Sequence, residues 1–284
     1  MNMARRFTYI VVEGPHDTAL VGKLLRQAPF LLEPVPVLKN VEPFWNDLVP
    51  RTYPPKNPRT NEEEFKRVRV PEFFQNHFHS VSVQWAEGFD QVPVVLTDSL
   101  DWLPRMPDGL GLLVDADQSS ASQVFSEVVA RVNDCHSGLS WGATPGTVVA
   151  GPPRAGVFVL PDNVNTGTLE DLLLDCATVA YPVLKPLAVQ YVQSVSAEPA
   201  AIPTGEEKEF AKAAGANKAV ISAMGSVLKP GKAVQNTIRD NRWLEGGALN
   251  LPRVAAFRAF LGDLLNEPVL NPCPSASTVA PFSS

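Results

Sequence analysis

Cysteine is scarce in this chain, and Cys135, Cys176 and Cys273 lie far apart with no C-x-x-C pair. They therefore form neither a disulfide framework nor a zinc-binding pattern. No apolar run approaches the roughly 20 residues needed to cross a bilayer, and the run after Arg5-Arg6 is too short for a signal-peptide core. The glycine-rich phosphate loops of P-loop and dinucleotide-binding proteins are missing as well. We therefore expect a cytoplasmic protein with no membrane partner.

Positive charge is also in short supply, because 24 Lys and Arg stand against 30 Asp and Glu, for a net charge of −6. A negatively charged protein has no general electrostatic affinity for nucleic acid, so such binding would need a local basic patch. A chain of 284 residues can bury a sizeable core, as one large domain or as a domain with an appendage. Composition therefore indicates a globular protein of enzyme size.

What the chain does have is an acidic residue wherever a short apolar strand is expected to end. These acids are Glu13 and Asp17 after residues 9–12, Asp115 and Asp117 after 112–114, and Asp162 and Glu170 after 157–160. Ligands and metals gather at the carboxyl ends of the strands in open parallel α/β sheets. Carboxylates that converge there repel one another unless a cation lies among them, and oxygen ligands favour Mg²⁺ or Mn²⁺. Each acid taken singly is also explained as a turn residue or a helix cap, but the whole set favours a metal site.

The first of these motifs resemble the TOPRIM domain. The sequence V-E-G at residues 12–14, with Asp17 following, and D-A-D at residues 115–117 on a later strand are similar to that domain in their order and strand context. The domain occurs in topoisomerases, bacterial primases, small-RNA maturases and OLD-type nucleases. The resemblance implies an α/β fold with a Rossmann-like, mostly parallel sheet flanked by helices, and divalent metal held by the acids.

A narrower resemblance is to a bacterial TOPRIM-like family that carries only an unknown-function label and is related to the OLD-type nucleases. It rests on G-V-F-V-L-P-D-N at residues 156–163 and on G-T-L-E-D at residues 167–171. The sequences N-K-A at 217–219 and K-P-G at 229–231 resemble the helical tail of the same family. The similarity covers roughly residues 7–265, which is most of the chain.

The TOPRIM resemblance implies that Glu13 binds metal or acts as a general acid and base, and that Asp115 and Asp117 hold a divalent ion. Alternate residues of a strand share one face, so both carboxylates of the D-x-D pair can meet one ion. Asp17 lies one helical turn past Glu13 and can point back to the same ion. Glu13, Asp17, Asp115 and Asp117 are thus candidate metal ligands for Mg²⁺ or Mn²⁺.

By resemblance to the OLD-type nucleases, Glu170 and Asp162 would complete a second metal position. Two ions roughly 4 Å apart can activate a water and stabilise the leaving oxygen in phosphodiester hydrolysis. The same resemblance implies that Lys218 neutralises the charge that develops on phosphate. The alternatives are that Glu170 is a favourable first-turn residue of a helix capped by Thr168, and that Lys218 is a solvated surface lysine.

Alternating strand and helix patterns predict the α/β domain over residues 1–180, with an insertion at about 33–79. From residue 181 the apolar spacing becomes helical, which predicts a helical C-terminal region over 181–266 packed on that domain. Residues 267–284 are rich in Pro, Ser, Ala and Thr, and this composition predicts a disordered tail. Helices are expected at residues 17–26, 90–103, 169–177, 183–195, 206–228, 234–239 and 254–265, with one more after Ser119 and Ser120.

The insertion is far longer than the usual connection of roughly two to six residues, and such loops are usually functional or disordered. Residues 51–69 carry six basic side chains against three glutamates. The aromatic residues in and around this segment are Trp45, Tyr53, Phe65, Phe73 and Phe74. Basic and aromatic side chains in alternation suit a nucleic-acid strand, with charges on phosphates and rings under bases. The candidate nucleic-acid contacts are Arg51, Lys56, Arg59, Lys66 and Arg67; the alternative is that the rings pack on the sheet and the charges are solvated.

Two classes of function remain open. The first is a metal-dependent phosphoryl-transfer enzyme, most simply a TOPRIM-type nuclease that acts on DNA or RNA. The second is a non-catalytic TOPRIM-like binding or sensor module that partners another protein, or a homo-oligomer. The retained acids favour the enzyme, whereas the negative charge and the missing ATPase domain of OLD-type enzymes favour the partner role. Topoisomerase and primase activities are not expected, because no strand-gating domain and no zinc-binding module can be seen.

Overall fold

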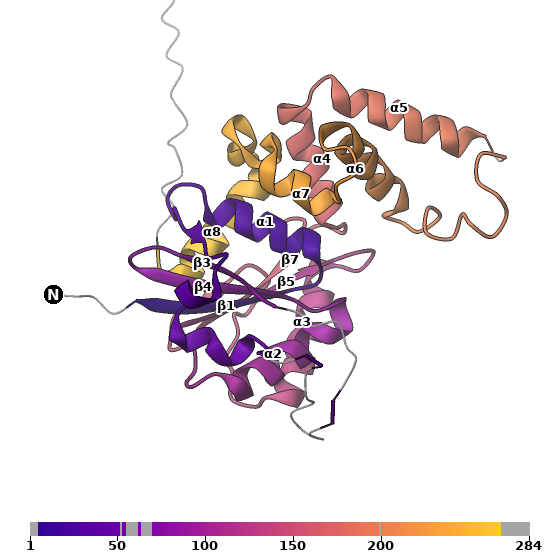
Figure 1. Ribbon diagram of the computed structural model, residues 1–284. Helices are drawn as coiled ribbons and strands as arrows, with labels where there is room; N and C mark the ends of the chain where they lie inside the picture. Colours follow the sequence, from indigo (N-terminus) through magenta and orange to yellow (C-terminus); the bar gives the residue numbers. More distant parts are fainter. Residues whose placement is uncertain (1–4, 52, 55–61, 64–69, 199, 268–284) are drawn as a thin grey trace, which may run out of the picture.

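The computed structural model describes residues 5–51, 53–54, 62–63, 70–198 and 200–267 (Figure 1). Its centre is a seven-stranded sheet with the strand order β2-β3-β4-β1-β5-β7-β6. The four long strands are mutually parallel, and the short strands at both edges are antiparallel to their neighbours. The strands are β1 Arg6–Val12, β2 Glu33–Pro34, β3 Glu72–Gln75, β4 His79–Trp85, β5 Gly109–Asp115, β6 Val148–Val149 and β7 Arg154–Leu160. The α/β fold with a mostly parallel sheet is therefore confirmed.

The long strands are buried on both faces, which explains the nearly continuous apolar runs of β1, β5 and β7. β4 is buried as well but alternates polar and apolar residues, as H-S-V-S-V-Q-W. Ile10 and Val12 of β1 face one hydrophobic core, while Tyr9 and Val11 of the same strand face a second core on the other side. Successive side chains of a strand point to opposite faces, so one short strand contributes to both cores. Each core then requires its own covering layer of helices.

Helices cover both faces of the sheet (Figure 1). The first core contains residues of α1, α4, α5, α6, α7 and α8, and the second contains residues of α2, α3 and the insertion. The helices are α1 Pro15–Leu25, α2 Val92–Trp102, α3 Ala121–Cys135, α4 Leu169–Ala180, α5 Leu184–Ala197, α6 Gly215–Leu228, α7 Val234–Asp240 and α8 Pro252–Leu265. None of the helices in the described part of the chain is long and apolar enough to span a bilayer.

Two helix starts differ in how well the sequence predicted them. Ser120 caps α3, and its hydroxyl accepts a hydrogen bond from the Gln123 backbone N–H at 3.3 Å, as a serine before an apolar helical pattern predicts. The helix expected from residue 206 begins only at Gly215, and residues 206–214 form turns. A Cβ atom at position 215 would lie 2.2 Å from the Phe210 carbonyl oxygen. Glycine therefore permits a tight reversal at the point where the pattern suggested a continuous helix.

The insertion packs part of its aromatic content into the core beneath the sheet. Trp45 is fully buried and donates a hydrogen bond from Nε1 to the Ser80 hydroxyl at 2.9 Å, while Phe44 stacks on Phe7 with ring centroids 4.3 Å apart. Phe73 and Phe74 belong to β3, a strand between β2 and β4 that the sequence did not predict. Trp45, Phe73 and Phe74 are thus not available for stacking on bases, and for these rings the packing alternative is correct.

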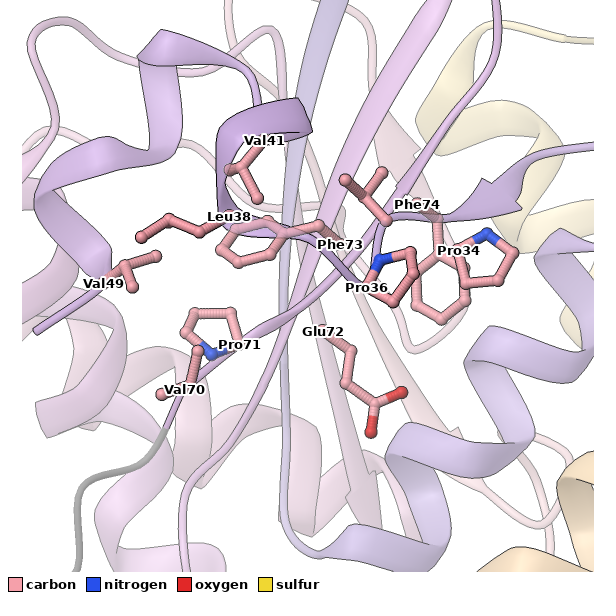
Figure 2. A pocket seen from close by; sticks show the side chains of 11 residues that line it. Pro34, Pro36, Leu38, Val41, Val49, Val70, Pro71, Glu72, Phe73 and Phe74 are labelled. Carbon is pink, nitrogen blue, oxygen red and sulfur yellow. The ribbon is translucent and has the colours of Figure 1, made fainter.

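An apolar hollow of about 390 Å³ lies between β2, β3 and the 3₁₀ turns of the insertion (Figure 2). Its wall includes Leu38, Val41, Pro71 and Phe73, with Glu72 as the acidic side chain at its border. Glu72 forms an ion pair with Arg239 of α7. None of the candidate metal ligands lines this hollow, so its walls and the acidic residues form separate features of the molecule.

Candidate active site at the carboxyl edge of the sheet

The parallel strands bring two of the acids together directly. Glu13 follows the last residue of β1, and Asp115 is the last residue of β5, the neighbour of β1 in the sheet. Glu13 Oε1 accepts a hydrogen bond from the Asp115 backbone N–H at 2.7 Å. The two carboxylates therefore lie at the same edge of the sheet, as the strand-end positions predicted.

Two more acids reach this edge from the first turns of helices. Asp17 lies in the first turn of α1, where Oδ2 accepts from the Gly14 backbone N–H at 2.8 Å. Glu170 lies in the first turn of α4, after Thr168 at the N-cap position. Asp115 Oδ1 accepts from the Leu169 backbone N–H at 2.9 Å, which fixes the start of α4 against the end of β5. We call Glu13, Asp17, Asp115 and Glu170 the acidic centre.

Crowding and burial raise the pKa of three of these carboxyls. Burial, followed by the charge of Glu13, raises the pKa of Asp17 to about 8. Burial raises the pKa of Glu13 to about 7 against the hydrogen bond from the Asp115 N–H. Burial and the charges of Asp17, Glu13 and Glu170 hold the pKa of Asp115 well above its usual value. Burial and mutual repulsion thus disfavour the charged forms of Glu13, Asp17 and Asp115.

Lys218 of α6 is the lysine whose charge acts on this centre. It lowers the pKa of Glu13, Asp17 and Glu170 through space. For Glu170, burial alone would raise the pKa, but the neighbouring His16 imidazole and Lys218 outweigh it, and the pKa lies below its usual value. His16 Nδ1 is 3.9 Å from Glu170 Oε1. Glu170 is therefore held in its charged form, while the three other acids are biased toward protonation.

The chemistry of the acidic centre fits a hard cation. Its possible ligands are all carboxylate oxygens, and Glu170 Oε2 is buried with no hydrogen-bond partner among the described residues. Such an orphaned buried oxygen costs free energy that a cation would recover. However, no three His, Cys, Asp or Glu side chains in the described ranges are arranged to hold a metal ion. A cation would have to compete with the backbone N–H groups that bind Glu13, Asp17 and Asp115.

Asp117 reaches the site in a way that the sequence did not predict. The strand β5 ends at Asp115, so the alternation of strand residues does not apply to Asp117. Asp117 has a φ of 50°, is exposed, and exchanges two 2.8 Å backbone hydrogen bonds with Gly167. Its charge still raises the pKa of Glu13. The prediction that Asp115 and Asp117 share one strand face, and can therefore meet one ion, is wrong, although Asp117 remains close to the acidic centre.

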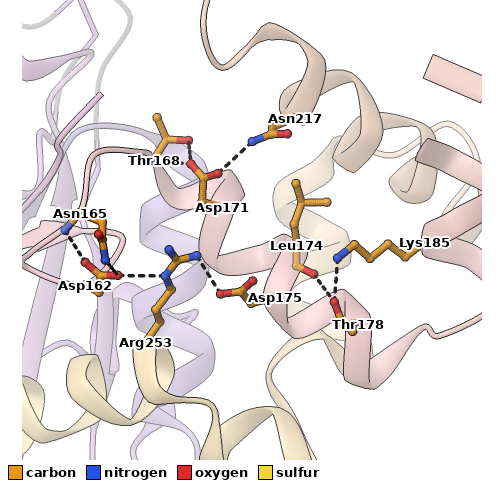
Figure 3. Close-up of polar contacts among 10 residues, drawn as sticks. All are labelled: Asp162, Asn165, Thr168, Asp171, Leu174, Asp175, Thr178, Lys185, Asn217 and Arg253. Carbon is orange, nitrogen blue, oxygen red and sulfur yellow. Dashed lines mark hydrogen bonds and ion pairs between the residues drawn. The ribbon is translucent and has the colours of Figure 1, made fainter. Parts of the chain in front are cut away.

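Asp162 belongs to a different network (Figure 3). Its Oδ1 accepts from the backbone N–H groups of Val164 and Asn165 at 3.1 and 2.8 Å. Its Oδ2 accepts from Asn165 Nδ2 at 2.8 Å and from Arg253 Nε at 3.0 Å. These partners lower the pKa of the Asp162 carboxyl against the effect of burial. Both oxygens are engaged in a turn and an ion pair with α8, so the structure corrects the expectation of a ligand role for Asp162.

The position of Lys218 depends on a contact that the sequence analysis missed. The Asp171 side chain accepts from the Thr168 backbone N–H at 2.8 Å. It also accepts from the Thr168 hydroxyl at 3.4 Å and from Asn217 Nδ2 at 3.0 Å (Figure 3). One carboxylate thus closes the first turn of α4 and anchors the first turn of α6. The available signal was the acid three residues after Thr168, a spacing typical of a helix N-terminus. Because Lys218 follows Asn217 directly, this contact holds the backbone of Lys218 near the acidic centre, while the lysine side chain is exposed, as in the alternative of a surface lysine.

Of the candidate nucleic-acid contacts in the insertion, only Arg51 lies among the residues that the structure describes. Arg51 is exposed, and Tyr53 has 69% of its surface exposed. Lys56, Arg59, Lys66 and Arg67, together with Phe65, lie outside the described residues. β3 is antiparallel to β4 and begins opposite Val83, two residues before the carboxyl end of β4. The chain therefore re-enters the sheet from the edge that carries the acidic centre.

Comparison with known proteins identifies a family but no activity. A family model described as "Protein of unknown function (DUF3226)" matches residues 8–266. No curated protein matches the chain. Among solved structures, the chain is similar to hypothetical protein PH0156 from Pyrococcus horikoshii OT3, with 15% identity and a TM-score of 0.50. That alignment covers 91% of this chain and 95% of the other, and at such identity it supports the α/β fold alone.

Proposed function

The chain belongs to the DUF3226 family, and we propose that it is a metal-dependent phosphoryl-transfer enzyme, a nuclease of the TOPRIM type that acts on DNA or RNA. One observation carries the proposal. Four carboxylates from β1, α1, β5 and α4 converge at the carboxyl edge of a parallel sheet, and three of them have raised pKa values. Structural carboxylates are usually placed where their charge is stabilised, so this arrangement indicates a site prepared for a cation.

The four acids of the acidic centre and Lys218 would have different roles, because their charges differ. Glu13, Asp17, Asp115 and Glu170 would hold Mg²⁺ or Mn²⁺, which when bound supplies Lewis-acid stabilisation of phosphate oxygens and a more acidic water. Glu13 would act as a metal ligand or as a general acid and base; its pKa of about 7 applies to the protein without metal. Lys218 would stabilise negative charge on the phosphate. The resemblance of the V-E-G and D-A-D motifs to the TOPRIM domain supports the same assignment.

A second candidate function is a non-catalytic module that binds a protein partner or a second copy of the chain. Two observations favour it. The oxygens of Glu13, Asp17 and Asp115 already accept backbone hydrogen bonds that stabilise the metal-free fold. In addition, Val183, Leu187 and Tyr191, four residues apart at the start and along α5, have 72%, 58% and 63% of their surface exposed. An exposed apolar stripe of this kind is typical of an interaction face.

The test of the proposal is a nuclease assay with Mg²⁺ or Mn²⁺ on single- and double-stranded DNA and RNA. A metal-dependent cleavage activity that copurifies with the protein, and that is abolished in the Asp115→Asn variant, supports the nuclease function. Absence of cleavage on all four substrates with both metals, combined with a stable dimer or a captured partner at α5, supports the module instead.

Glu170→Gln is expected to lower metal-dependent cleavage at least about tenfold, because the buried Oε2 would lose its charge as a ligand. A carboxylate in the first turn of a helix contributes roughly 0.3–1 kcal/mol through the helix dipole. The melting temperature should therefore fall by no more than roughly 4 °C for a protein of this size. Differential scanning calorimetry and the cleavage assay measure the two effects on the same sample.

Glu127→Gln on α3 is the matched control for Glu170→Gln. Glu127 is exposed and pairs with Arg131 four residues later on the same helix, so its replacement should leave cleavage unchanged. A large loss of melting temperature in Glu170→Gln with full activity would show that Glu170 is only a helix-start residue.

Replacing Lys56, Arg59, Lys66 and Arg67 with Ser is expected to weaken nucleic-acid binding mainly at low salt. Each phosphate contact that is lost should flatten the log–log salt dependence of binding by about one unit. Metal affinity should not change, because the acidic centre keeps all its residues. Fluorescence anisotropy at several salt concentrations and calorimetry with Mn²⁺ provide the two measurements.

A charge-matched control for that variant replaces Arg26, Lys39, Lys208 and Lys232 with Ser, since all four are exposed and none belongs to residues 51–69. Equal salt dependence in the two variants would mean that the insertion makes no specific phosphate contacts. The insertion would then be structural or would recruit a protein.

A further inference from the structure

A hollow of about 540 Å³ adjoins the acidic centre on the side of α6. One wall is a face of α6 formed by Gly215, Lys218, Ala219 and Ser222, which are spaced three or four residues apart. The lining also contains Asp117, from the connection that follows β5. None of the four acids of the acidic centre lines the hollow. The hollow lies next to that centre because Asp117, which lines it, follows two residues after Asp115.

The hollow is lined by two acids, Asp117 and Glu209, and two lysines, Lys212 and Lys218. α6 starts there with no side chain capping its first turn, and the Gly215 N–H donates to the Lys212 carbonyl oxygen at 2.8 Å. The positive end of the helix dipole lies at this end of the helix. Within the described residues, the Lys218 ammonium makes no ion pair or hydrogen bond. Lys212, which also lines the hollow, is paired with Glu209 at 2.7 Å. Lys218, which is exposed, is thus the lysine of this lining that has no ion pair among the described residues, and it can meet an anionic group of a ligand.

The rest of the hollow suits a flat, weakly polar group. Phe210 and Ala219 line it and also pack against the first core, and Gly215 allows the Phe210 backbone to approach α6 closely. Its volume lies within the roughly 300–1,000 Å³ typical of pockets for small organic ligands. A phosphate near Lys218 with a sugar and base against Phe210 would match both the charge and the size.

We propose that this hollow binds one unpaired nucleotide next to the phosphate at the acidic centre, so that the substrate is single-stranded nucleic acid and not a duplex. This inference rests on the proposed nuclease function for its biological meaning. Binding itself depends only on the residues that line the hollow. A base that is paired and stacked in a duplex cannot enter a space of this size without leaving its partner, so we expect a single strand to bind more tightly.

The test compares anisotropy of a labelled 12-nucleotide thymidylate strand with that of the same strand annealed to its complement, in buffer with EDTA and no divalent metal. We expect at least tenfold tighter binding of the single strand. Ser222→Trp places a large ring in the hollow from an exposed position on α6 and should weaken single-strand binding at least tenfold. Val227→Trp is the matched control, since Val227 is 65% exposed on the same helix and does not line the hollow.

The outcomes separate this inference from the proposed function. Single-strand binding that Ser222→Trp alone removes, with no cleavage by any metal, supports the nucleotide site and refutes the nuclease. Cleavage that is unchanged in Ser222→Trp, or equal affinity for the single strand and the duplex, overturns the nucleotide site and leaves the nuclease standing. No binding of either nucleic acid by the parent protein also overturns it. Unchanged Mn²⁺ affinity in Ser222→Trp, measured by calorimetry, shows that the acidic centre has kept its structure.

Discussion

Asp115→Asn should reduce metal-dependent cleavage by at least about 100-fold, since even the groups that merely orient a metal ligand are worth about 10–100-fold. The substitution removes the charge but keeps an acceptor oxygen for the Leu169 N–H, which Asp115 Oδ1 binds at 2.9 Å. The start of α4 should therefore stay in place. Because burial disfavours the charged form of Asp115, the melting temperature should be equal to or higher than that of the parent.

The control for this prediction is Asp134→Asn, at an exposed position near the end of α3. Rates are measured under single-turnover conditions with Mn²⁺, and melting temperatures by calorimetry on the same preparations. A variant that cleaves at the parent rate would remove Asp115 from the chemistry. A variant that is inactive but also unfolded at the assay temperature would show that the carboxylate has a structural role.

Without added metal, the protein should be less stable at pH 8 than at pH 6. Glu13 and Asp17 have folded-state pKa values of about 7 and about 8, whereas unfolded carboxyls titrate near pH 4. Between these values the folded chain binds more protons than the unfolded chain, so stability is lost as pH rises through the folded pKa values. The loss is expected to be on the order of a few kcal/mol. It should lower the melting temperature by roughly 5–10 °C.

Mn²⁺ should reverse this loss, because a cation replaces the protons that neutralise the acidic centre. The rise in melting temperature on adding Mn²⁺ should be larger at pH 8 than at pH 6. Asp17→Asn is the control: its amide oxygen can still accept from the Gly14 N–H, but a group that titrates near pH 8 is gone. Its melting temperature should depend less on pH. Equal pH dependence in the parent and the variant would contradict the high pKa of Asp17.

Much of the fold followed from local patterns. The apolar run that ends at Val12 had to be a buried strand, and the acid after it had to lie at the strand's carboxyl end. The same reasoning placed Asp115 beside Glu13, because parallel neighbours end at one edge of a sheet. The N-cap positions of Ser120 and Thr168 were also readable, since capping depends on residues within one helical turn.

Contacts between segments that are distant in the sequence could not be predicted in this way. Asp162 looked like another strand-end acid until the structure paired it with Arg253, 91 residues later in the chain. Trp45 lay in a segment whose composition suited nucleic acid, yet it packs under the sheet with its indole N–H on Ser80. In both cases the pattern of residue types was ambiguous, and the partner that decided the role lies far away in the sequence.

The sequence by itself determined the α/β order, the ends of the long strands and the acids that stand there, because periodicity and strand alternation are local properties of the chain. Only the tertiary structure decided which charges act together. Burial raises the pKa of Asp17 and Asp115, and the contact of Asn217 with Asp171 fixes the start of α6 so that Lys218 lies beside them. Coulomb interactions and desolvation depend on distances through space and on excluded water, and neither quantity is encoded in the spacing of residues along the chain.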